Sequence, residues 1–200
     1  MNLVAWALEH PLVYRLWQAP FEADKLRPVF RHNDLSRVSR VLDVGCGPGT
    51  NAREFRHAEY LGVDINPRYV AEGRRRRGRE FVVGDVTSWR PPTAARFDFI
   101  LVNSLLHHLD DADVRRALAM LRDALSEGGH LHLLELVLPA EAGIASLLAR
   151  ADRGRFSRSL EHWRALCEDL FEPVVFEPYT LRGLGIALWN MVYFKGRARP

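Results

Sequence analysis

The 200 residues are enough for one domain with a sizeable core, and hydrophobic and charged contents of 48% and 26% are ordinary for a globular protein. The formal net charge of +3 makes a nucleic-acid partner unlikely, despite a sequence pI near 9.1. Two cysteines, Cys46 and Cys167, exclude a disulfide framework and favour a reducing compartment. The apolar start is broken at Glu9, His10 and Pro11, too early for a membrane span. We therefore expect a soluble, cytoplasmic protein.

The first 37 residues have a helical pattern, which Pro11, Pro20 and Pro28 divide into short pieces. Short apolar runs then alternate with helical segments, as in a parallel sheet that is covered on both faces. Strands are expected at 40–45, 59–66, 80–86, 97–103 and 130–138, and helices at 50–56, 67–77 and 111–129, the last one closed by two glycines.

The last 40 residues have a different pattern. A helix is expected at 159–171, and two β-like runs follow at 173–181 and 186–196 with no helix between them. These two runs would pair as a hairpin at the edge of the sheet. The predicted fold is a Rossmann-like, seven-stranded, mostly parallel α/β sheet with helices on both faces and an antiparallel C-terminal hairpin.

The stretch VLDVGCGPGT, residues 41–50, places Gly45, Gly47 and Gly49 at the end of the first strand. Glycine loses more conformational entropy on folding than any other residue, so this cluster indicates a tight turn or a close backbone approach to a ligand. A dinucleotide fingerprint would need glycine at position 50, where the sequence has Thr50. The spacing therefore disfavours a dinucleotide.

Acidic residues accompany three of the predicted strands. Asp43 lies beside the glycine turn, Asp64 ends the second strand and Asp85 ends the third. A carboxylate at Asp64 can accept both hydroxyls of a ribose, and one at Asp85 can accept an adenine amino group. Asp43 can hold a cationic amino group and would repel a pyrophosphate. A ligand with adenine, ribose and a cationic amino-acid tail fits all three.

Over about residues 38–138, the chain resembles the class I S-adenosylmethionine-dependent methyltransferases of the small-molecule type. The resemblance lies in five segments: VLDVGCGPGT, LGVDIN, VVGDV, FDFILVNSLLHHL and LSEGGHLHLLEL. The resemblance implies S-adenosylmethionine as the cofactor, with the first motif around its methionine part, Asp64 at its ribose, Asp85 and Val86 at its adenine, and Asn103 at its edge. The expected cofactor site comprises Asp43, Gly45, Cys46, Gly47, Gly49, Asp64, Ile65, Asp85, Val86 and Asn103.

His107 and His108 follow the fourth strand, where the family places the transferred methyl group. Histidine is easily poised as a base near neutral pH, so these two are the candidate catalytic residues, although packing or cofactor contact explains them as well. Some related methyltransferases carry acidic metal ligands in this segment. Ser104 and Leu105 supply no carboxylate here, and no metal is expected.

Two groups of arginines are conspicuous. Arginines 74–77 point around the whole circumference of a helix and indicate a solvated helix end. A second group lies at 150–158, where this fold builds its substrate cap, and Arg153 and Arg155 are candidates for binding an anionic acceptor. Tyr14, in the apolar N-terminal helices that form a lid in this family, is a further candidate for substrate contact.

The sequence thus predicts one methyltransferase domain with an N-terminal lid (1–37), a cofactor-binding core (38–138), and a substrate cap with the hairpin (139–200). It would move a methyl group from S-adenosylmethionine to an oxygen, nitrogen or carbon atom of a small, partly apolar acceptor, mainly by positioning the partners and excluding water. The alternatives are an RNA methyltransferase and a non-catalytic S-adenosylmethionine-binding module, with a nicotinamide-dependent dehydrogenase a distant third.

Overall fold

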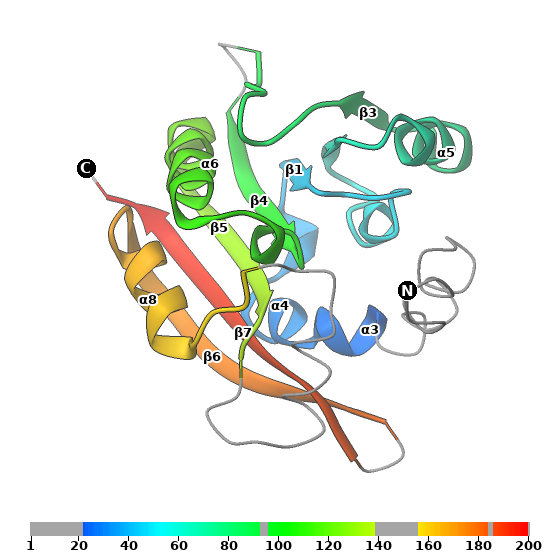
Figure 1. Ribbon diagram of the computed structural model, residues 1–200. Coiled ribbons are helices and arrows are strands. Elements are labelled where there is room, and N and C mark those ends of the chain that lie inside the picture. Colours follow the sequence, from blue (N-terminus) through cyan, green and yellow to red (C-terminus); the bar gives the residue numbers. More distant parts are fainter. Residues whose placement is uncertain (1–21, 93–95, 139–155, 184–185, 200) are drawn as a thin grey trace, which may run out of the picture. The chain divides into compact units, whose positions relative to one another are not determined.

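A computed structural model describes residues 22–92, 96–138, 156–183 and 186–199 (Figure 1). The chain divides into two compact units, residues 1–33 and 34–200. The described part of the first unit has two short helices, α3 (Glu22–Lys25) and α4 (Arg27–His32). Pro28 lies in the first turn of α4, where a backbone N–H has no partner within the helix, so proline loses no hydrogen bond there. All other described elements belong to the second unit.

The second unit contains a seven-stranded sheet in its described residues, with the strand order β3-β2-β1-β4-β5-β7-β6. Strands β1 to β5 are parallel, whereas β7 runs antiparallel to both β5 and β6. The predicted fold class is confirmed, hairpin included. The strands are β1 (Arg40–Val44), β2 (Glu59–Asp64), β3 (Glu80–Val83), β4 (Phe97–Asn103), β5 (Leu125–Leu136), β6 (Phe171–Gly183) and β7 (Ile186–Ala198).

The helices α5, α6 and α8 begin after residues whose side chains cap them. Asn66 accepts a hydrogen bond from the Arg68 N–H at the start of α5, and Asp110 does the same for Asp113 at the start of α6. Among the described helices, none has the length and apolar character needed to cross a bilayer. The described residues of this unit form the helices α5 (Pro67–Arg77), α6 (Asp111–Ala124) and α8 (Leu160–Glu168) and the 3₁₀ turns η2 (Leu35–Arg37), η3 (Asn51–Glu54) and η4 (Leu106–His108).

The two faces of the sheet are packed differently. On one face, the apolar stripes of α6 and α8 bury side chains such as Leu42, Ile100 and Trp163 in one continuous core. On the other face, Gly73 lets α5 approach β3 closely, because a Cβ at this position would lie 2.7 Å from the Phe81 ring. With both faces covered, a ligand has the carboxyl ends of the parallel strands as its place of entry.

Two predicted helices are shorter in the structure. The segment predicted as a helix over 50–56 forms only the 3₁₀ turn η3, and the helix predicted over 111–129 ends at Ala124. The following residues belong to β5, because Leu125 pairs with Phe97 of β4. Gly129 lies against the sheet: a Cβ there would be 2.7 Å from the Phe97 carbonyl. Gly129 thus allows close approach of the strands, and Gly128 adopts a φ of 75°, so the two glycines do not end a helix.

Candidate active site

The glycine turn after β1 is bound to the end of β2. Gly45, Gly47 and Gly49 have φ angles of 71°, 53° and 76°, a region that residues with side chains rarely adopt. The Gly45 N–H donates to the carbonyl of Val63 at 2.8 Å, and the Gly47 N–H donates to a carboxylate oxygen of Asp64 at 2.8 Å. The three glycines are therefore required by the backbone conformation of this turn.

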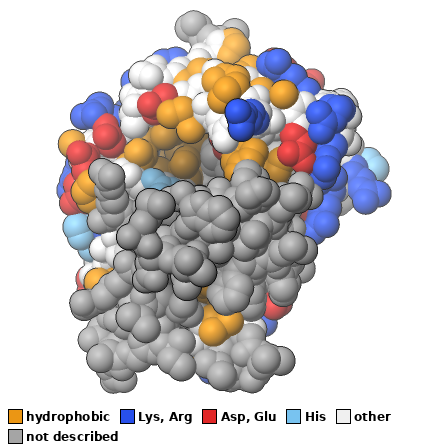
Figure 2. Space-filling model, turned by 45° about the vertical axis from the view of Figure 1, so that its right-hand side comes forward, with side chains coloured by type: hydrophobic (Ala, Val, Ile, Leu, Met, Phe, Trp, Pro, Cys, Tyr) orange, Lys and Arg blue, Asp and Glu red, His pale blue; other side chains and the backbone are white. Residues whose placement is uncertain are grey.

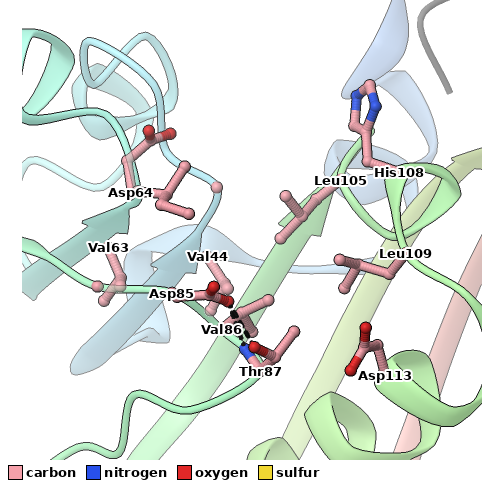
Figure 3. A pocket seen from close by; sticks show the side chains of 13 residues that line it. Val44, Val63, Asp64, Asp85, Val86, Thr87, Leu105, His108, Leu109 and Asp113 are labelled. Carbon is pink, nitrogen blue, oxygen red and sulfur yellow. Dashed lines mark hydrogen bonds between the residues drawn. The ribbon is translucent and has the colours of Figure 1, made fainter.

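Beside this turn lies a cavity of about 360 Å³, a size suited to a small ligand (Figure 3). In the close-up, Asp64 and Asp85 come from the ends of β2 and β3, and Leu105, His108 and Leu109 form the opposite wall. The strand ends and loops that meet here are those expected for an open α/β sheet. The cavity is lined by Val44, Gly45, Val63, Asp64, Ile65, Gly84, Asp85, Val86, Thr87, Leu105, His108, Leu109 and Asp113.

Asp43 is fully buried beneath the turn. One of its oxygens, Oδ2, accepts hydrogen bonds from the Tyr60 hydroxyl at 2.6 Å and from Asn51 Nδ2 at 3.3 Å. The other, Oδ1, is buried and has no hydrogen-bond partner among the described residues. Burial raises the pKa of Asp43 to about 6, against the two hydrogen bonds that lower it, and the Asp64 charge raises it further. An orphaned buried carboxylate oxygen fits a cationic group.

Asp64 ends β2 at the edge of the cavity, and both of its carboxylate oxygens accept hydrogen bonds from the backbone. Its Oδ2 accepts from Gly47, and its Oδ1 accepts from the Asn66 N–H at 2.8 Å. Each carboxylate oxygen keeps a second lone pair, so both can still accept a hydroxyl group. The next residue, Ile65, exposes 66% of its surface and lines the cavity, which suits it to contact a flat apolar group such as an adenine ring.

Asp85 and Val86 follow β3 on the same side of the cavity. Asp85 Oδ1 accepts from both the N–H and the hydroxyl of Thr87, at 2.9 and 2.8 Å, which orients the carboxylate (Figure 3). Val86 is almost fully buried and lines the cavity with its neighbour. Of the three acidic residues predicted from the sequence, Asp64 and Asp85 thus line the cavity, whereas Asp43 is buried in β1 next to Val44, which lines it.

Five of the ten predicted cofactor residues are not among those that line the cavity: Asp43, Cys46, Gly47, Gly49 and Asn103. The Cys46 side chain is buried, and a Cβ on Gly62 would lie 2.8 Å from its Sγ. Burial raises the pKa of the Cys46 thiol well above its usual range, and the charges of Asp43 and Asp64 raise it further, so the thiol stays neutral. Asn103 is the last residue of β4 and accepts a hydrogen bond from Ser104 Oγ at 3.2 Å.

The turn that follows β4, residues 104–109, contains both predicted catalytic histidines. His108 is exposed and lines the cavity, whereas His107 is only 3% exposed. His107 Nδ1 lies 2.7 Å from Oε2 of Glu135, a buried carboxylate on β5. Ser104 starts this turn with φ of 56° and is the one non-glycine residue with positive φ in the described part of the chain. Such a conformation costs roughly 1–3 kcal/mol.

The arginines differ in what they contact. Tyr14, Arg153 and Arg155 lie outside the described residues. Arg158, from the same group, is 3% exposed and is used within the protein: it donates to the carbonyls of Leu106 and Leu109 and pairs with Asp111. An acceptor contact is not its role.

The arginines of α5 and its surroundings support the prediction of a helix end. Figure 2 shows Lys and Arg side chains gathered along one side of the face it draws. Arg74 donates to the Phe81 carbonyl, Arg79 to the Ala58 carbonyl, and Arg76 pairs with Glu72. Arg74 thus ties α5 to β3, Arg76 pairs within the helix, and Arg79 ties the segment after α5 to the residue before β2.

The sequence analysis missed three residues that hold the site together: Asn51, Tyr60 and Glu135. Asn51 and Tyr60 contact Asp43 across 8 and 17 positions of sequence, and no pattern indicates such pairs. Glu135 did have an indication, since a carboxylate in the apolar run LHLLELVL is out of place in a buried strand unless it has a partner.

Comparison with known proteins agrees with this geometry. Residues 41–129 match a family described as methyltransferase domain. The structure superposes on the N-methyltransferase NodS from Bradyrhizobium japonicum, solved with S-adenosyl-L-homocysteine, with a TM-score of 0.74 and 20% identity over 97% of this chain and 95% of NodS. Residues 41–129 thus resemble a methyltransferase domain, and the likeness to NodS shows that this chain has the same fold.

Two relatives of this chain are named trans-aconitate 2-methyltransferase. The protein from Variovorax paradoxus is 30% identical over 166 residues, which cover 73% of this chain and 61% of the relative. The protein from Rhizobium etli is 28% identical over 189 residues, which cover 88% and 70%. The alignment thus spans less than two thirds of the Variovorax protein. The substrate in its name is that of the relative and is not thereby that of this chain.

Proposed function

We propose that this protein binds S-adenosylmethionine and transfers its methyl group to a small-molecule acceptor. When bound, this cofactor supplies a methyl group on a positively charged sulfur, which is already activated for displacement. The observation that carries the proposal is the buried Asp43 Oδ1 without a partner among the described residues, beside a cavity whose strand ends present Asp64 and Asp85.

The chain's own residues would hold the three parts of the cofactor separately. Asp43 would hold the cationic amino group, and the glycine turn would give the amino-acid tail backbone contacts without side-chain hindrance. Asp64 would accept the ribose hydroxyls, and Asp85 the adenine amino group, with Ile65 and the apolar opposite wall of the cavity around the ring. Such fixed contacts contribute to transfer by orientation and by excluding water.

We propose further that the acceptor carries carboxylate groups. Two relatives are named for trans-aconitate, a tricarboxylate, and this chain has four arginines in positions 150–158. Arg158 is used inside the protein, so Arg153 and Arg155 are the residues that we assign to acceptor binding. The buried thiols of both cysteines fit our further proposal that the protein works in the cytoplasm.

The predicted roles of His107 and His108 depend on the acceptor. A carboxylate oxygen is ionised at neutral pH and needs no base before methylation, whereas a hydroxyl or an amine must lose a proton. For an acceptor of the second kind, we expect His107→Gln to lower turnover by about 10²–10⁴-fold with little change in cofactor affinity. For a carboxylate acceptor, we expect no such loss.

Calorimetric titration with S-adenosylhomocysteine tests the cofactor site. Asp64→Ala should weaken binding by about 1–3 kcal/mol, since the ribose hydroxyls lose their acceptor. Asp98→Ala is a matched control: Asp98 also accepts two backbone N–H groups, from Ser39 and Arg40, but lies near the amino ends of the strands. Equal affinities of the two variants would contradict the assignment.

The acceptor is tested by turnover of trans-aconitate with S-adenosylmethionine, followed by mass spectrometry of the methylated product. We expect Arg153→Ala or Arg155→Ala to raise the KM for this acceptor, and Arg75→Ala, which removes an exposed arginine of α5, to leave it unchanged. Binding of S-adenosylhomocysteine without turnover of any carboxylate or neutral acceptor would instead indicate a non-catalytic binding module.

A further inference from the structure

Glu135 is a buried charged residue that the proposed methyl transfer does not use. It lies on β5 and is 0% exposed, yet every hydrogen bond that it accepts from the described residues comes from the turn after β4. Its Oε1 accepts from the N–H groups of Leu105 and Leu106, at 2.9 and 2.6 Å, and its Oε2 lies 2.7 Å from Nδ1 of His107. One carboxylate thus binds three consecutive residues of the turn.

This arrangement fixes the tautomer of His107. Burial raises the pKa of Glu135, but the charge and the hydrogen bond of His107 and the two backbone N–H groups lower it more, with a net decrease from its usual value. The carboxylate is therefore ionised and can only accept hydrogen bonds. Nδ1 of His107 must therefore carry the hydrogen between the two groups, and in the neutral form of the ring the lone pair lies on Nε2.

The opposite side of the turn is held by a buried cation. Arg158 donates to the carbonyl of Leu106 at 3.2 Å and to the carbonyl of Leu109 at 2.7 Å. Its guanidinium also pairs with Asp111 at 2.8 Å, at the start of α6, and lies over the Trp163 ring. An anion thus binds the N–H groups of the turn, and a cation binds its carbonyl groups.

A turn that was needed only for stability would not require a buried charge. Removing a carboxylate from water is costly, and replacing a buried ionic group with apolar residues is often neutral or stabilising. The turn also begins at Ser104, whose left-handed conformation persists only if the surroundings enforce it. Glu135 supplies this enforcement, because the next two N–H groups point at its Oε1.

We propose that Glu135 is the positioning residue of the cofactor cavity: it holds residues 104–109 in the arrangement in which Leu105, His108 and Leu109 form one wall. These three residues line the cavity opposite Asp64 and Asp85, so a displaced turn would change the space for the adenosine part of the cofactor. The inference rests on the proposed cofactor site.

Two variants separate positioning from stability. Glu135→Leu removes all three contacts with a side chain of similar size, and Glu135→Gln keeps an oxygen for the two N–H groups but presents an amide N–H to His107. We expect Glu135→Leu to weaken S-adenosylhomocysteine binding about 10–100-fold and Glu135→Gln about 3–10-fold. Tyr193→Phe is the matched control, since it removes a buried hydrogen bond, at 2.9 Å, to Nδ1 of His132 on the same strand. Its affinity should stay within about twofold of the wild type.

Two measurements without any ligand test the contacts directly. In wild-type protein, ¹⁵N NMR should show His107 with its hydrogen on Nδ1, and Glu135→Gln should shift this hydrogen to Nε2. Amide hydrogen exchange of Leu105 and Leu106 should be slow in wild type and in Glu135→Gln, and at least tenfold faster in Glu135→Leu. If Glu135 had only a structural role, Glu135→Gln would not change the His107 tautomer while the amides of Leu105 and Leu106 stay protected from exchange.

The outcomes separate the two proposals. Wild-type affinity in Glu135→Leu, or affinity losses no larger than in Tyr193→Phe, would overturn the positioning role. A wild-type His107 with its hydrogen on Nε2 would overturn it as well. If the wild-type protein binds no S-adenosylhomocysteine, the proposed function fails, and the tautomer and the amide exchange still decide whether Glu135 holds the turn.

Discussion

The two walls of the cavity are held in place by different physical means. On the β1–β3 side, the ligand-facing groups belong to the strand ends and to a glycine turn, and neighbouring backbone N–H groups orient the carboxylates. On the β4 side, the wall is a turn that two buried charged side chains hold. Glu135, 29 positions from Leu106, accepts from the Leu106 N–H, and Arg158, 52 positions from Leu106, donates to the Leu106 carbonyl. The first wall depends on local backbone conformation and the second on tertiary contacts.

The largest effect is expected on the glycine side. Gly49→Ala should destabilise the fold by roughly 4 kcal/mol, because φ is 76° and the new Cβ would lie 2.5 Å from the buried ring of Phe81. Gly78→Ala is the matched control: φ is 60°, but nothing lies within 4 Å of the Cβ, and we expect a loss of about 1 kcal/mol. Urea unfolding of both variants measures the difference, and equal losses would show that the Phe81 ring moves aside freely.

A slightly smaller loss of stability is expected on the opposite wall. Arg158→Ala leaves the carbonyls of Leu106 and Leu109 without their donor and should cost about 3 kcal/mol. Arg76→Ala removes a surface pair with Glu72, in which the arginine side chain is 48% exposed, and should cost less than 1 kcal/mol. If thermal unfolding shows the same small change for both variants, the turn does not depend on Arg158.

The difference between the walls also explains what the sequence predicted. The seven-stranded sheet followed from the alternation of apolar runs and helices, and Asp43, Asp64 and Asp85 could be found because each lies at or beside a strand end. These indications are local, within one strand and the turn after it.

The features that were predicted wrongly or missed depend on tertiary contacts. Residues 125–129 follow a helix directly but belong to β5, where Leu125 pairs with Phe97 of β4, since a strand partner outweighs local propensity. Arg158 was grouped with Arg153 and Arg155 by charge, but its partners are backbone carbonyls of a distant turn. The contact between His107 and Glu135 spans 28 positions, and the sequence indicates only that Glu135 needs a partner, not that the partner is His107.

On the glycine side, the charge of Asp43 should matter more than its hydrogen bond. Asp43→Asn keeps an oxygen for the Tyr60 hydroxyl but removes the negative charge, and we expect S-adenosylhomocysteine to bind about 100-fold more weakly, or about 2.7 kcal/mol. Tyr60→Phe is the control that keeps the charge and should bind at least as tightly as wild type. Calorimetry of both variants decides, and a larger loss in Tyr60→Phe would contradict a charge-based site.

The smallest expected effect is the dependence of cofactor affinity on pH. The folded protein holds the pKa of Asp43 at about 6 instead of 3.8, mainly by burial, so that the ligand-free protein binds more protons than the unfolded chain between these values. Ionising Asp43 therefore costs the ligand-free fold roughly 3 kcal/mol, at about 1.4 kcal/mol per pK unit, and its stability falls as the pH rises through this range. A cationic amino group at Oδ1 reverses this preference, because it favours the ionised carboxylate. Affinity for S-adenosylhomocysteine should accordingly rise about tenfold from pH 5 to pH 7, and this slope should vanish in Asp43→Asn. A flat profile in the wild type, or the same slope in the variant, would place the amino group elsewhere than at Asp43.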